Sequence, residues 1–546
     1  MRGQFKHAAA VGAIALLLAV AACGGSSGRG GPVTIASSTA PRSADNQADF
    51  TTQGIELYSV VNTPLLVFKR AAGPAGSTIL PGLARSLPAI SKDGLTYTFR
   101  LRKGLRYSNG RPIKASDFKF AIKRALRLNW DASAFLTDHI AGAMQFDSGK
   151  ARDLSGITAR NRSGKIVVKL TAPYGPILDV LALPGTAPLP RSTPMAPQPA
   201  TGTLGDGPYK WARIDPQHDY VLVKNAGFNG VPATSVPPGQ VDTIDYRVNP
   251  DLVANARAVL SNAEDVFDPN DTIDPSMLPL VSSQAGVRYQ AVPANSTFYF
   301  FMAVNQKPFD NPAARQAVIA ALDQRRLSKL DNGFLTPDCH LIPFGLPGAS
   351  SPSTCPLGDP TKGPNLTRAK QLIAKSGQAG APVVVWGQNQ PPRDKYAHYL
   401  TRLLNSLGLK ATTKMVAPNA YFKAIGNAAT KPQIGVAYWL ENFPNPDDFA
   451  QLFISSSILP QNSENYGYVR DPRVDSTEAK LSRIPASSLS SVAGQWAGLD
   501  AYMISQGYYA AFGHEAFPKF YSTRLRFRAG ILSVEYQTDL TSLRLK

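Results

Sequence analysis

Hydrophobic and polar positions along the chain follow two different periods, which predict a mixed α/β protein. In the stretch 95–102 apolar residues occupy every second position, as in a strand with one buried face. From Ser116 onward apolar residues recur every three or four positions, as in an amphipathic helix. Asp93-Gly94 and Ser108-Asn109-Gly110 supply turn residues before and after the extended stretch. These periods predict a strand, a turn and a helix in succession.

A strand–helix–strand pattern in the later part of the chain predicts a parallel sheet. Pro382–Trp386 is a short apolar run, residues 396–407 carry a helical apolar stripe that Gly408 ends, and residues 409–416 are extended in character. Such a crossover unit places its two strands parallel in one sheet. Another helix is expected to begin at Asn311-Pro312, with the asparagine as cap and the proline in the first turn.

The loop after the strand Gln433–Trp439 is the best candidate site on topology alone. Residues 440–446 follow this strand, and a short helix is expected to restart at Asp447. In open α/β sheets, ligands bind outside the carboxyl ends of the strands. The pattern therefore predicts a binding site at this loop.

The N-terminus is typical of a lipoprotein signal. Arg2 and Lys6 precede an apolar run at 8–20, and Cys23 follows Val-Ala-Ala as in a lipobox. The run is shorter than the roughly twenty residues of a membrane-spanning helix. We expect residues 1–22 to be cleaved and Cys23 to be acylated, with residues 23–31 as a flexible tether. An ordinary secretory signal with an incidental cysteine is the alternative.

The length of the chain indicates several domains, and its net charge bears on its partners. A body of about 515 residues is large for one core, so two or three domains are expected. The net charge is +19, and loss of Arg2 and Lys6 with the signal lowers it to +17. This charge suits anionic lipid or cell-wall polymer, or is simply spread over a large surface. No dense basic run points to nucleic acid, which we exclude as a partner.

Three cysteines are present, and two of them are expected to form a disulfide. If Cys23 carries lipid, Cys339 and Cys355 remain as a pair in an oxidising compartment. Two free thiols are the alternative. His340 lies beside Cys339, but one histidine and two cysteines match zinc-site spacings poorly, so no metal and no cofactor are predicted.

Several motifs resemble those of the peptide/nickel-type (family 5) solute-binding proteins of ABC importers. They occur in the family's order along almost the whole mature chain. The matching stretches are Leu80–Leu126 (LPGLARSLPAISKDGLTYTFRLRKGLRYSNGRPIKASDFKFAIKRAL), Gly205–Lys210 (GDGPYK), Val223–Asn225 (VKN), Ala258–Val266 (AVLSNAEDV) and Phe298–Leu327 (FYFFMAVNQKPFDNPAARQAVIAALDQRRL).

The resemblance implies a type II periplasmic-binding-protein fold, with two α/β lobes, a hinge and an extra domain inserted in the first lobe. The implied ranges are 32–69 for the first part of lobe I, 70–203 for the inserted outer domain, 204–295 for the second part of lobe I, 296–507 for lobe II and 508–546 for the third part of lobe I. A solute would bind between the lobes, and hinge closure would bury it.

The resemblance also sharpens the loop at 440–446. It is similar to the W-x-x-D-Y-x-x-P-x-x-F segment that lines the cleft of peptide binders, where the aspartate meets the peptide's ammonium group. Trp439 matches the tryptophan, but Asn442 stands at the aspartate, and an amide cannot make the same charge-assisted bond. Either Glu441 takes over this role, or the ligand lacks a free N-terminus. Because Asn442 lacks the fixed charge and the chain carries a large positive excess, we predict the second case, in which blocked, neutral or anionic solutes bind at least as well as free-amine peptides.

Six residues are the candidate ligand contacts. They are Trp439, Asn442, Glu441, Leu440, Tyr508 and Asn62. Trp439 is expected to face the ligand, with plain core packing as the alternative. Tyr438, one position earlier in the alternation, is then expected to point the other way and to pack.

The motifs of catalysis do not occur, so an enzyme is not predicted. The chain has no G-x-S-x-G, H-E-x-x-H or P-loop sequence. We expect a monomeric, lipid-anchored receptor on the outer face of the cytoplasmic membrane, held there by lipid on Cys23. It would capture a short peptide or peptide-like solute for ABC permease subunits, and nickel, an oligosaccharide or a siderophore-like or antibiotic-like ligand are the alternatives that the resemblance leaves open. An extracellular hydrolase and a ligand-sensing lipoprotein without transport are the alternatives.

Overall fold

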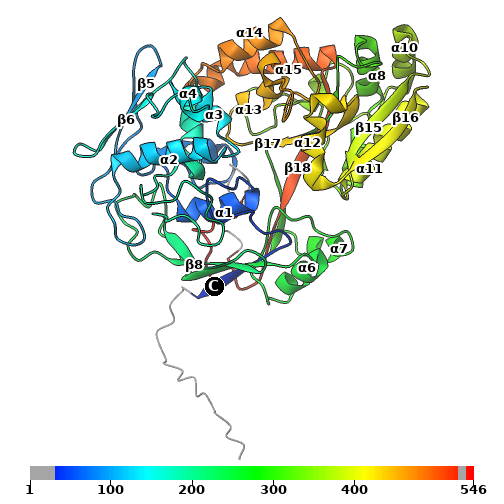
Figure 1. Cartoon of the computed structure of the whole chain (residues 1–546). Helices are drawn as coiled ribbons and strands as arrows, with labels where there is room; N and C mark the ends of the chain where they lie inside the picture. The colour runs from blue at the N-terminus through cyan, green and yellow to red at the C-terminus, as the bar shows by residue number, and fades with distance from the viewer. Residues whose placement is uncertain (1–30, 527–536) are drawn as a thin grey trace, which may run out of the picture.

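The computed structural model describes residues 31–526 and 537–546 of the chain (Figure 1). The expected signal peptide, Cys23 and nearly all of the tether lie outside the described residues. None of the helices in the described ranges combines the length and apolarity needed to cross a membrane.

One long strand, β18 (Tyr509–Tyr521), belongs to both halves of the molecule. Its first part pairs antiparallel with β13 (Ser296–Met302), and its second part pairs with β11 (Val266–Phe267) and β12 (Tyr289–Pro293). Because β12 leads directly into β13, the chain crosses between the halves there and again within β18. In Figure 1, β18 runs from the upper half, beside β17 (Ile434–Leu440), to the lower half, near α6 (Leu252–Leu260).

The lower half contains one end of the large sheet. Its strands lie in the order β11, β1 (Pro32–Ser37), β10 (Thr243–Val248), β9 (Asp219–Lys224) and β8 (Tyr209–Asp215). Strand β1 is parallel to both of its neighbours. Helix α1 (Thr52–Val61) buries Leu57, Val60 and Val61 against this sheet in one apolar cluster. The helices α6 and α7 (Leu278–Ser282) pack beside β11 and β12.

The upper half continues the same sheet and covers both of its faces with helices. Its strands lie in the order β16 (Lys410–Val416), β15 (Pro382–Gln388), β17, β13 and β18. One apolar cluster joins the sheet to α8 (Pro312–Ala321), α9 (Gln324–Leu330), α10 (Leu366–Ser376) and α11 (Arg393–Ser406). A second cluster joins the other face to α12 (Pro418–Ile425), α13 (Asp447–Ala450), α14 (Pro472–Leu481) and α15 (Ala493–Gln506).

A separate antiparallel sheet lies at the left of Figure 1. Its strands are β4 (Ala89–Ile90), β5 (Thr96–Arg100), β7 (Lys165–Lys169) and β6 (Ile157–Arg160). The remaining elements of this region are β2 (Leu66–Phe68), β3 (Ile79–Pro81), α2 (Ala115–Arg127), α3 (Ala134–Thr137), α4 (Ala143–Asp147) and α5 (Ile177–Val180). Its core takes in Phe443 from the upper half, and the Gly175 amide donates to the Ser482 carbonyl at 2.7 Å. This region therefore contacts the upper half as well as the lower one.

The periodic segments of the sequence form the elements that they predict. The stretch 95–102 contains β5, and the amphipathic segment after Ser116 is α2. Strands β15 and β16 are parallel with α11 between them, as the strand–helix–strand pattern predicts. Asn311 caps α8 by accepting a hydrogen bond from the Ala313 amide at 2.9 Å.

A fully buried ion pair ties α2 to the N-terminal segment of the lower half. Arg124 contacts Asp45 at 2.5 Å, and both side chains have no exposed surface. The Arg124 guanidinium also donates to Gln47 Oε1 and to the carbonyls of Pro194 and Ala196. Because every donor direction of the guanidinium is used, the desolvation cost of the pair is offset by hydrogen bonds.

We predict that Arg124→Ala lowers the free energy of unfolding by about 3–5 kcal/mol, because it leaves Asp45 buried and unpaired. Urea unfolding of the mature chain measures this loss. The exposed pair of Arg42 and Asp131, at 3.0 Å, is the matched control. There, Arg42→Ala should cost less than about 1 kcal/mol. Equal small losses in the two variants would contradict the prediction.

Candidate ligand-binding site

A cleft between the two halves is formed by two adjoining cavities of about 410 and 330 Å³. They share six lining residues: Asn270, Thr272, Arg393, Tyr438, Glu515 and Phe517. Asn270 and Thr272 come from the lower half, and Arg393 and Tyr438 from the upper half, whereas Glu515 lies on the shared strand β18. Both halves and the strand that joins them therefore contribute to one site.

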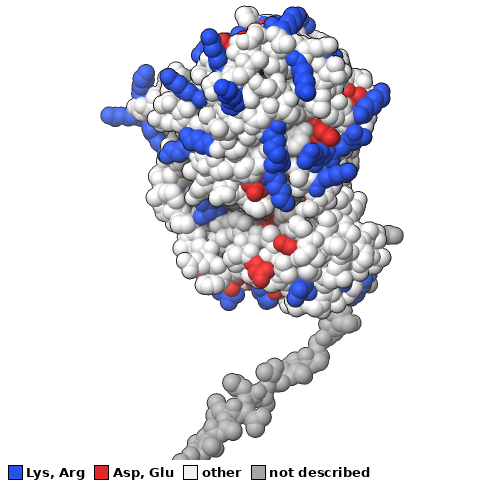
Figure 2. Space-filling model, turned by 90° about the vertical axis from the view of Figure 1, so that its right-hand side faces the viewer, with Lys and Arg blue, Asp and Glu red and all other residues white. Residues whose placement is uncertain are grey.

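The larger cavity has aromatic walls, and the smaller one extends to the loop after β17. Phe298, Phe334, Tyr396 and Tyr438 line the larger cavity. Leu440, Glu441 and Asn442 line the smaller one, together with Phe50, Thr52 and Ile55 from around α1. In Figure 2 a hollow crosses the face of the molecule between its upper and lower parts, and Lys and Arg side chains gather above it.

Titratable residues that line the cleft are mostly acidic, although the chain as a whole is basic, and burial raises the pKa of Asp271 to about 8. The two cavities present four carboxyl side chains, Asp271, Asp331, Glu441 and Glu515, and one guanidinium, that of Arg393. Arg393 lies 4.1 Å from the ring centroid of Tyr438 and donates to Gln388 Oε1 at 3.3 Å. The lining therefore offers a cation more partners than it offers an anion.

The structure reverses the expected directions of Tyr438 and Trp439. Tyr438 lines both cavities and stacks on Phe298, with ring centroids 5.1 Å apart. Trp439 is not among the lining residues of either cavity and packs half-buried against the aromatic cluster on the other face of the sheet. Because β17 is apolar on both faces, its alternation cannot tell which face ends at the cleft. Whether either ring contacts a solute stays a prediction.

Glu441 is held at the cleft by a short chain of hydrogen bonds. Its carboxylate accepts from Asn295 Nδ2 at 2.7 Å, and its amide donates to the Asn295 carbonyl at 2.9 Å. Asn295 Oδ1 in turn accepts from the Gly345 amide at 3.1 Å. A Cβ at position 345 would lie 2.2 Å from Asn295 Oδ1, so this approach requires glycine. The segment 339–355 thus holds Glu441 in position through Gly345 and Asn295.

Asn442 makes its polar contacts inside the protein. Its backbone amide donates to Asp448 Oδ2 at 2.6 Å and its side-chain amide to Asp448 Oδ1 at 3.0 Å. Asp448 has no exposed surface, and this burial raises its pKa to about 7 despite the two hydrogen bonds. An aspartate at 442 would bring a second carboxylate against Asp448. This contact is a structural reason for an amide at the position where peptide binders carry the acid.

Two candidate residues lie outside the cleft. Asn62, at the C-terminal end of α1, lines a separate cavity of about 60 Å³ with Ser59, Lys69 and Arg70. Tyr508 donates to Asp471 Oδ2 at 2.6 Å and lies under the guanidinium of Arg315. Neither is among the lining residues of the two cleft cavities. Of the six candidates, the structure brings Leu440, Glu441 and Asn442 together.

Arg393, Asp331 and Glu515 are lining residues that the sequence reasoning missed. Arg393 begins α11, just after the carboxyl end of β15, so the rule applied to β17 would have found it if applied to this strand too. Asp331 follows α9, and Glu515 lies in the middle of β18. No local pattern indicates that these two acids meet.

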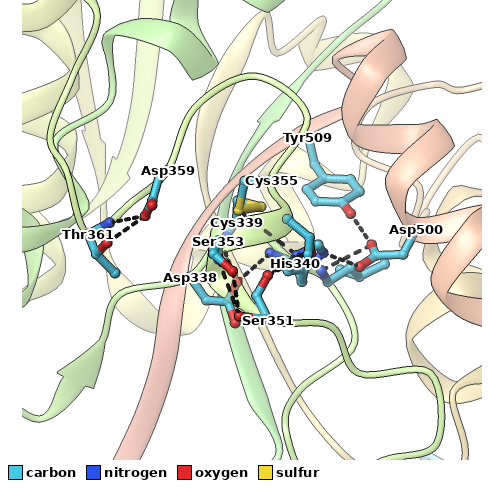
Figure 3. Close-up of a disulfide and its surroundings, with 12 residues drawn as sticks. Asp338, Cys339, His340, Ser351, Ser353, Cys355, Asp359, Thr361, Asp500 and Tyr509 are labelled. Carbon is cyan, nitrogen blue, oxygen red and sulfur yellow. Dashed lines mark hydrogen bonds and ion pairs between the residues drawn. A yellow bond between two sulfur atoms is a disulfide. The ribbon is translucent and has the colours of Figure 1, made fainter.

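Cys339 and Cys355 form a disulfide, with Cα atoms 6.1 Å apart, as expected (Figure 3). Behind it, His340 Nδ1 lies 3.0 Å from Asp500, and His514 on β18 lies 3.2 Å from Asp338. Burial lowers the pKa of His340, but the hydrogen bond and charge of Asp500 outweigh it, and the pKa is raised. The disulfide loop is thereby joined to β18 and α15.

The same residues include four potential metal donors. Atoms of Asp338, Cys339, His340 and Cys355 lie within 4.8 Å of one another. Both sulfur atoms are bonded to each other, however, and a metal site of this kind uses thiolates. With the disulfide formed, this group does not offer a zinc ligand set.

The model of the bacterial extracellular solute-binding proteins, family 5, matches residues 78–460 of the chain. The chain belongs to this family. Family 5 contains the solute-binding proteins of ABC importers. Among similar members, the glutathione-binding protein GsiB of Escherichia coli O6:K15:H31 (strain 536 / UPEC) is 26% identical over 395 residues, 71% of each chain. The dipeptide-binding protein DppE of Bacillus subtilis (strain 168) is 25% identical over 392 residues, 68% of each chain.

Solved structures of other binding proteins share the fold over nearly the whole chain. Clavulanic acid biosynthesis oligopeptide binding protein 2 superimposes with a TM-score of 0.84 at 21% identity, covering 95% of this chain and 96% of that one. The murein tripeptide binding protein MppA in its unliganded open form gives 0.73 at 17% identity, with 94% and 97% covered. The fold is therefore the two-lobed, type II periplasmic-binding-protein fold, as expected.

We predict that the mature chain without Cys23 contains no free thiol, because Cys339 and Cys355 are bonded to each other. Titration with a thiol reagent in denaturant, without reductant, should give a value near zero. The variant Cys355→Ser is the positive control and should release one thiol, that of Cys339. Two reactive thiols in the unaltered chain would contradict the disulfide.

Proposed function

We propose that this family 5 protein captures a short peptide or peptide-like solute in the cleft between its lobes and delivers it to an ABC permease. The observation that carries the proposal is the cleft itself, which is lined from both halves and from β18 and has Arg393 and several carboxyl groups on its walls. A free peptide has a carboxylate and an ammonium group, which these side chains can pair with. GsiB and DppE, by their names, bind glutathione and a dipeptide.

The acidic lining favours one of the two ligand alternatives. Glu441 lines the smaller cavity beside Asn442. We propose that Glu441 takes the role that the aspartate has in peptide binders, so that a free N-terminus is accepted. The domain ranges expected from the resemblance are proposed unchanged, with lobe I at 32–69, 204–295 and 508–546, lobe II at 296–507 and the outer domain at 70–203.

Membrane anchoring completes the proposal. The signal sequence and lipobox support cleavage before Cys23 and acylation of its thiol, which would hold the receptor on the outer face of the cytoplasmic membrane near the permease. A receptor tethered in this way acts as a monomer and needs no cofactor. The proposed function is thus transport rather than catalysis.

Calorimetry with the mature chain tests the binding step. Di- to tetrapeptides should bind, and Glu441→Gln should weaken free-amine peptides more than their N-acetylated counterparts. Failure of every peptide to bind would overturn the proposal. Hydrolysis of the peptides would favour an extracellular hydrolase, and full growth on peptides after loss of the permease genes would favour a sensor without transport.

We predict that Tyr438→Ala weakens peptide binding by about 1–3 kcal/mol, the range for loss of one buried aromatic side chain. The neighbouring change Trp439→Ala should affect binding less and thermal stability more, because Trp439 packs within lobe II. Calorimetry and thermal unfolding of both variants measure the two effects. A larger loss of binding in Trp439→Ala would show that the tryptophan is the ligand contact.

We predict that Cys23→Ala abolishes acylation and moves the protein from the membrane fraction to the medium or periplasm, because acyl chains dominate membrane retention. Fractionation and mass spectrometry of the N-terminus measure this. An unaltered protein that carries no lipid and still sediments with membranes would contradict the anchoring.

A further inference from the structure

The larger cavity combines two neighbouring carboxyl groups with aromatic walls. Asp331 and Glu515 both line it, together with Phe298, Phe334 and Tyr396. Asp331 is 6% exposed, and Glu515 is half-buried. This cavity, about 410 Å³ in volume, is lined by three carboxyl groups, those of Asp271, Asp331 and Glu515, and by one guanidinium, that of Arg393, so it offers a cation more partners than an anion.

The backbone holds the two acids in place. Asp331 follows the last turn of α9, and Glu515 pairs with Leu335 of β14 (Leu335–Thr336), the short strand that comes just after it. The Glu515 amide donates to Ser296 Oγ at 2.9 Å, and the Ala516 amide to the Phe334 carbonyl at 2.7 Å. The two acids therefore line one cavity from backbone that is held by α9, β14 and β18.

These carboxyl groups repel each other in the absence of a partner. Burial raises the pKa of Asp331 to about 7, with a further contribution from the charge of Glu515, and burial raises the pKa of Glu515 as well. Arg393 opposes both shifts from a distance, but in the described part of the chain it forms no ion pair with either acid. A cation placed between them would relieve the repulsion.

We propose that this cavity receives a basic side chain of the bound peptide, lysine- or arginine-like, between Asp331 and Glu515. The inference rests on the proposed peptide-binding function and names the class of peptide. The aromatic walls suit the methylene stem of such a side chain, and their rings attract its charged end. Glu441, in the adjoining cavity, remains for the peptide's own ammonium group.

Matched tripeptides test the proposal. Three positional series based on alanine carry either lysine or norleucine, which has the same stem without the charge. In at least one position lysine should bind about tenfold more tightly than norleucine, the ratio that corresponds to lowering the pKa of one carboxyl by one unit. Calorimetry with the mature chain at pH 8 measures both affinities.

Variants show whether the two acids carry the preference. Asp331→Asn and Glu515→Gln should each reduce the lysine preference severalfold, measured as the ratio of the lysine and norleucine affinities within the same variant. Asp242→Asn is the matched control, since Asp242, just before β10, is exposed, pairs with Lys224 and lines neither cleft cavity. This variant should keep the full preference.

The preference should also depend on pH. Asp331 faces Glu515 on β18 and Tyr396, Arg393 and Lys395 on α11. The pKa of Asp331 is about 7, so its carboxyl takes up a proton and loses its charge when the pH falls below this value. The preference for lysine should therefore fall from pH 8 to pH 5.5. Binding of the lysine peptide at pH 7 should release protons, which calorimetry in two buffers of different ionisation enthalpy detects.

The outcomes separate this inference from the function on which it rests. Peptides that bind with equal affinity for lysine and norleucine at all three positions would overturn the inference and leave the receptor function standing. A lysine preference that survives both acid variants would also overturn it. If no peptide of either series binds, the proposed function itself fails.

Discussion

The hydrogen-bond ladder of β18 is the constraint on which the two-lobed structure depends. One continuous strand pairs with β13 in the upper half and with β11 and β12 in the lower half, so its register fixes both parts of the large sheet. Gly513, at the point of transition, lies so close to β14 that a Cβ would come within 2.5 Å of the Thr336 carbonyl. Residues just after it line the cleft, which places the hinge strand and the site on the same few residues.

Local periodicity was sufficient to predict the elements but not their meeting places. The strand at β5, the helix α2 and the parallel pair β15 and β16 follow from patterns within one short window of sequence. The cleft brings together Asn270, Asp331, Arg393 and Glu515, which are far apart in the chain. Such contacts follow from strand register and lobe packing. Neither can be read from the spacing of apolar residues, which repeats every two residues in a strand and every 3.6 in a helix. The reversal at Tyr438 and Trp439 has the same origin, because a strand buried on both faces carries no signal of direction.

Charge illustrates a second limit of composition. The chain carries a net charge of +19, yet the cleft presents four carboxyl groups to one guanidinium. Exposed charges are screened over roughly 8–10 Å in physiological salt, whereas charges within a cleft act at short range and with less screening. The basic exterior therefore bears on what the protein adheres to, and the acidic lining bears on what it retains.

The loop from Cys339 to Cys355 has a consequence for how such a receptor can diverge. Through Gly345 and Asn295 it supports Glu441, and neither of these two residues is among the lining residues of the two cleft cavities. Substitutions in this loop can tilt or loosen that carboxylate while every wall residue of the cleft stays the same. Two homologues with identical cleft linings can then differ in the solutes they accept, and a comparison restricted to contact residues would overlook the difference. The solute selectivity of this architecture can therefore change through residues that do not line the cleft.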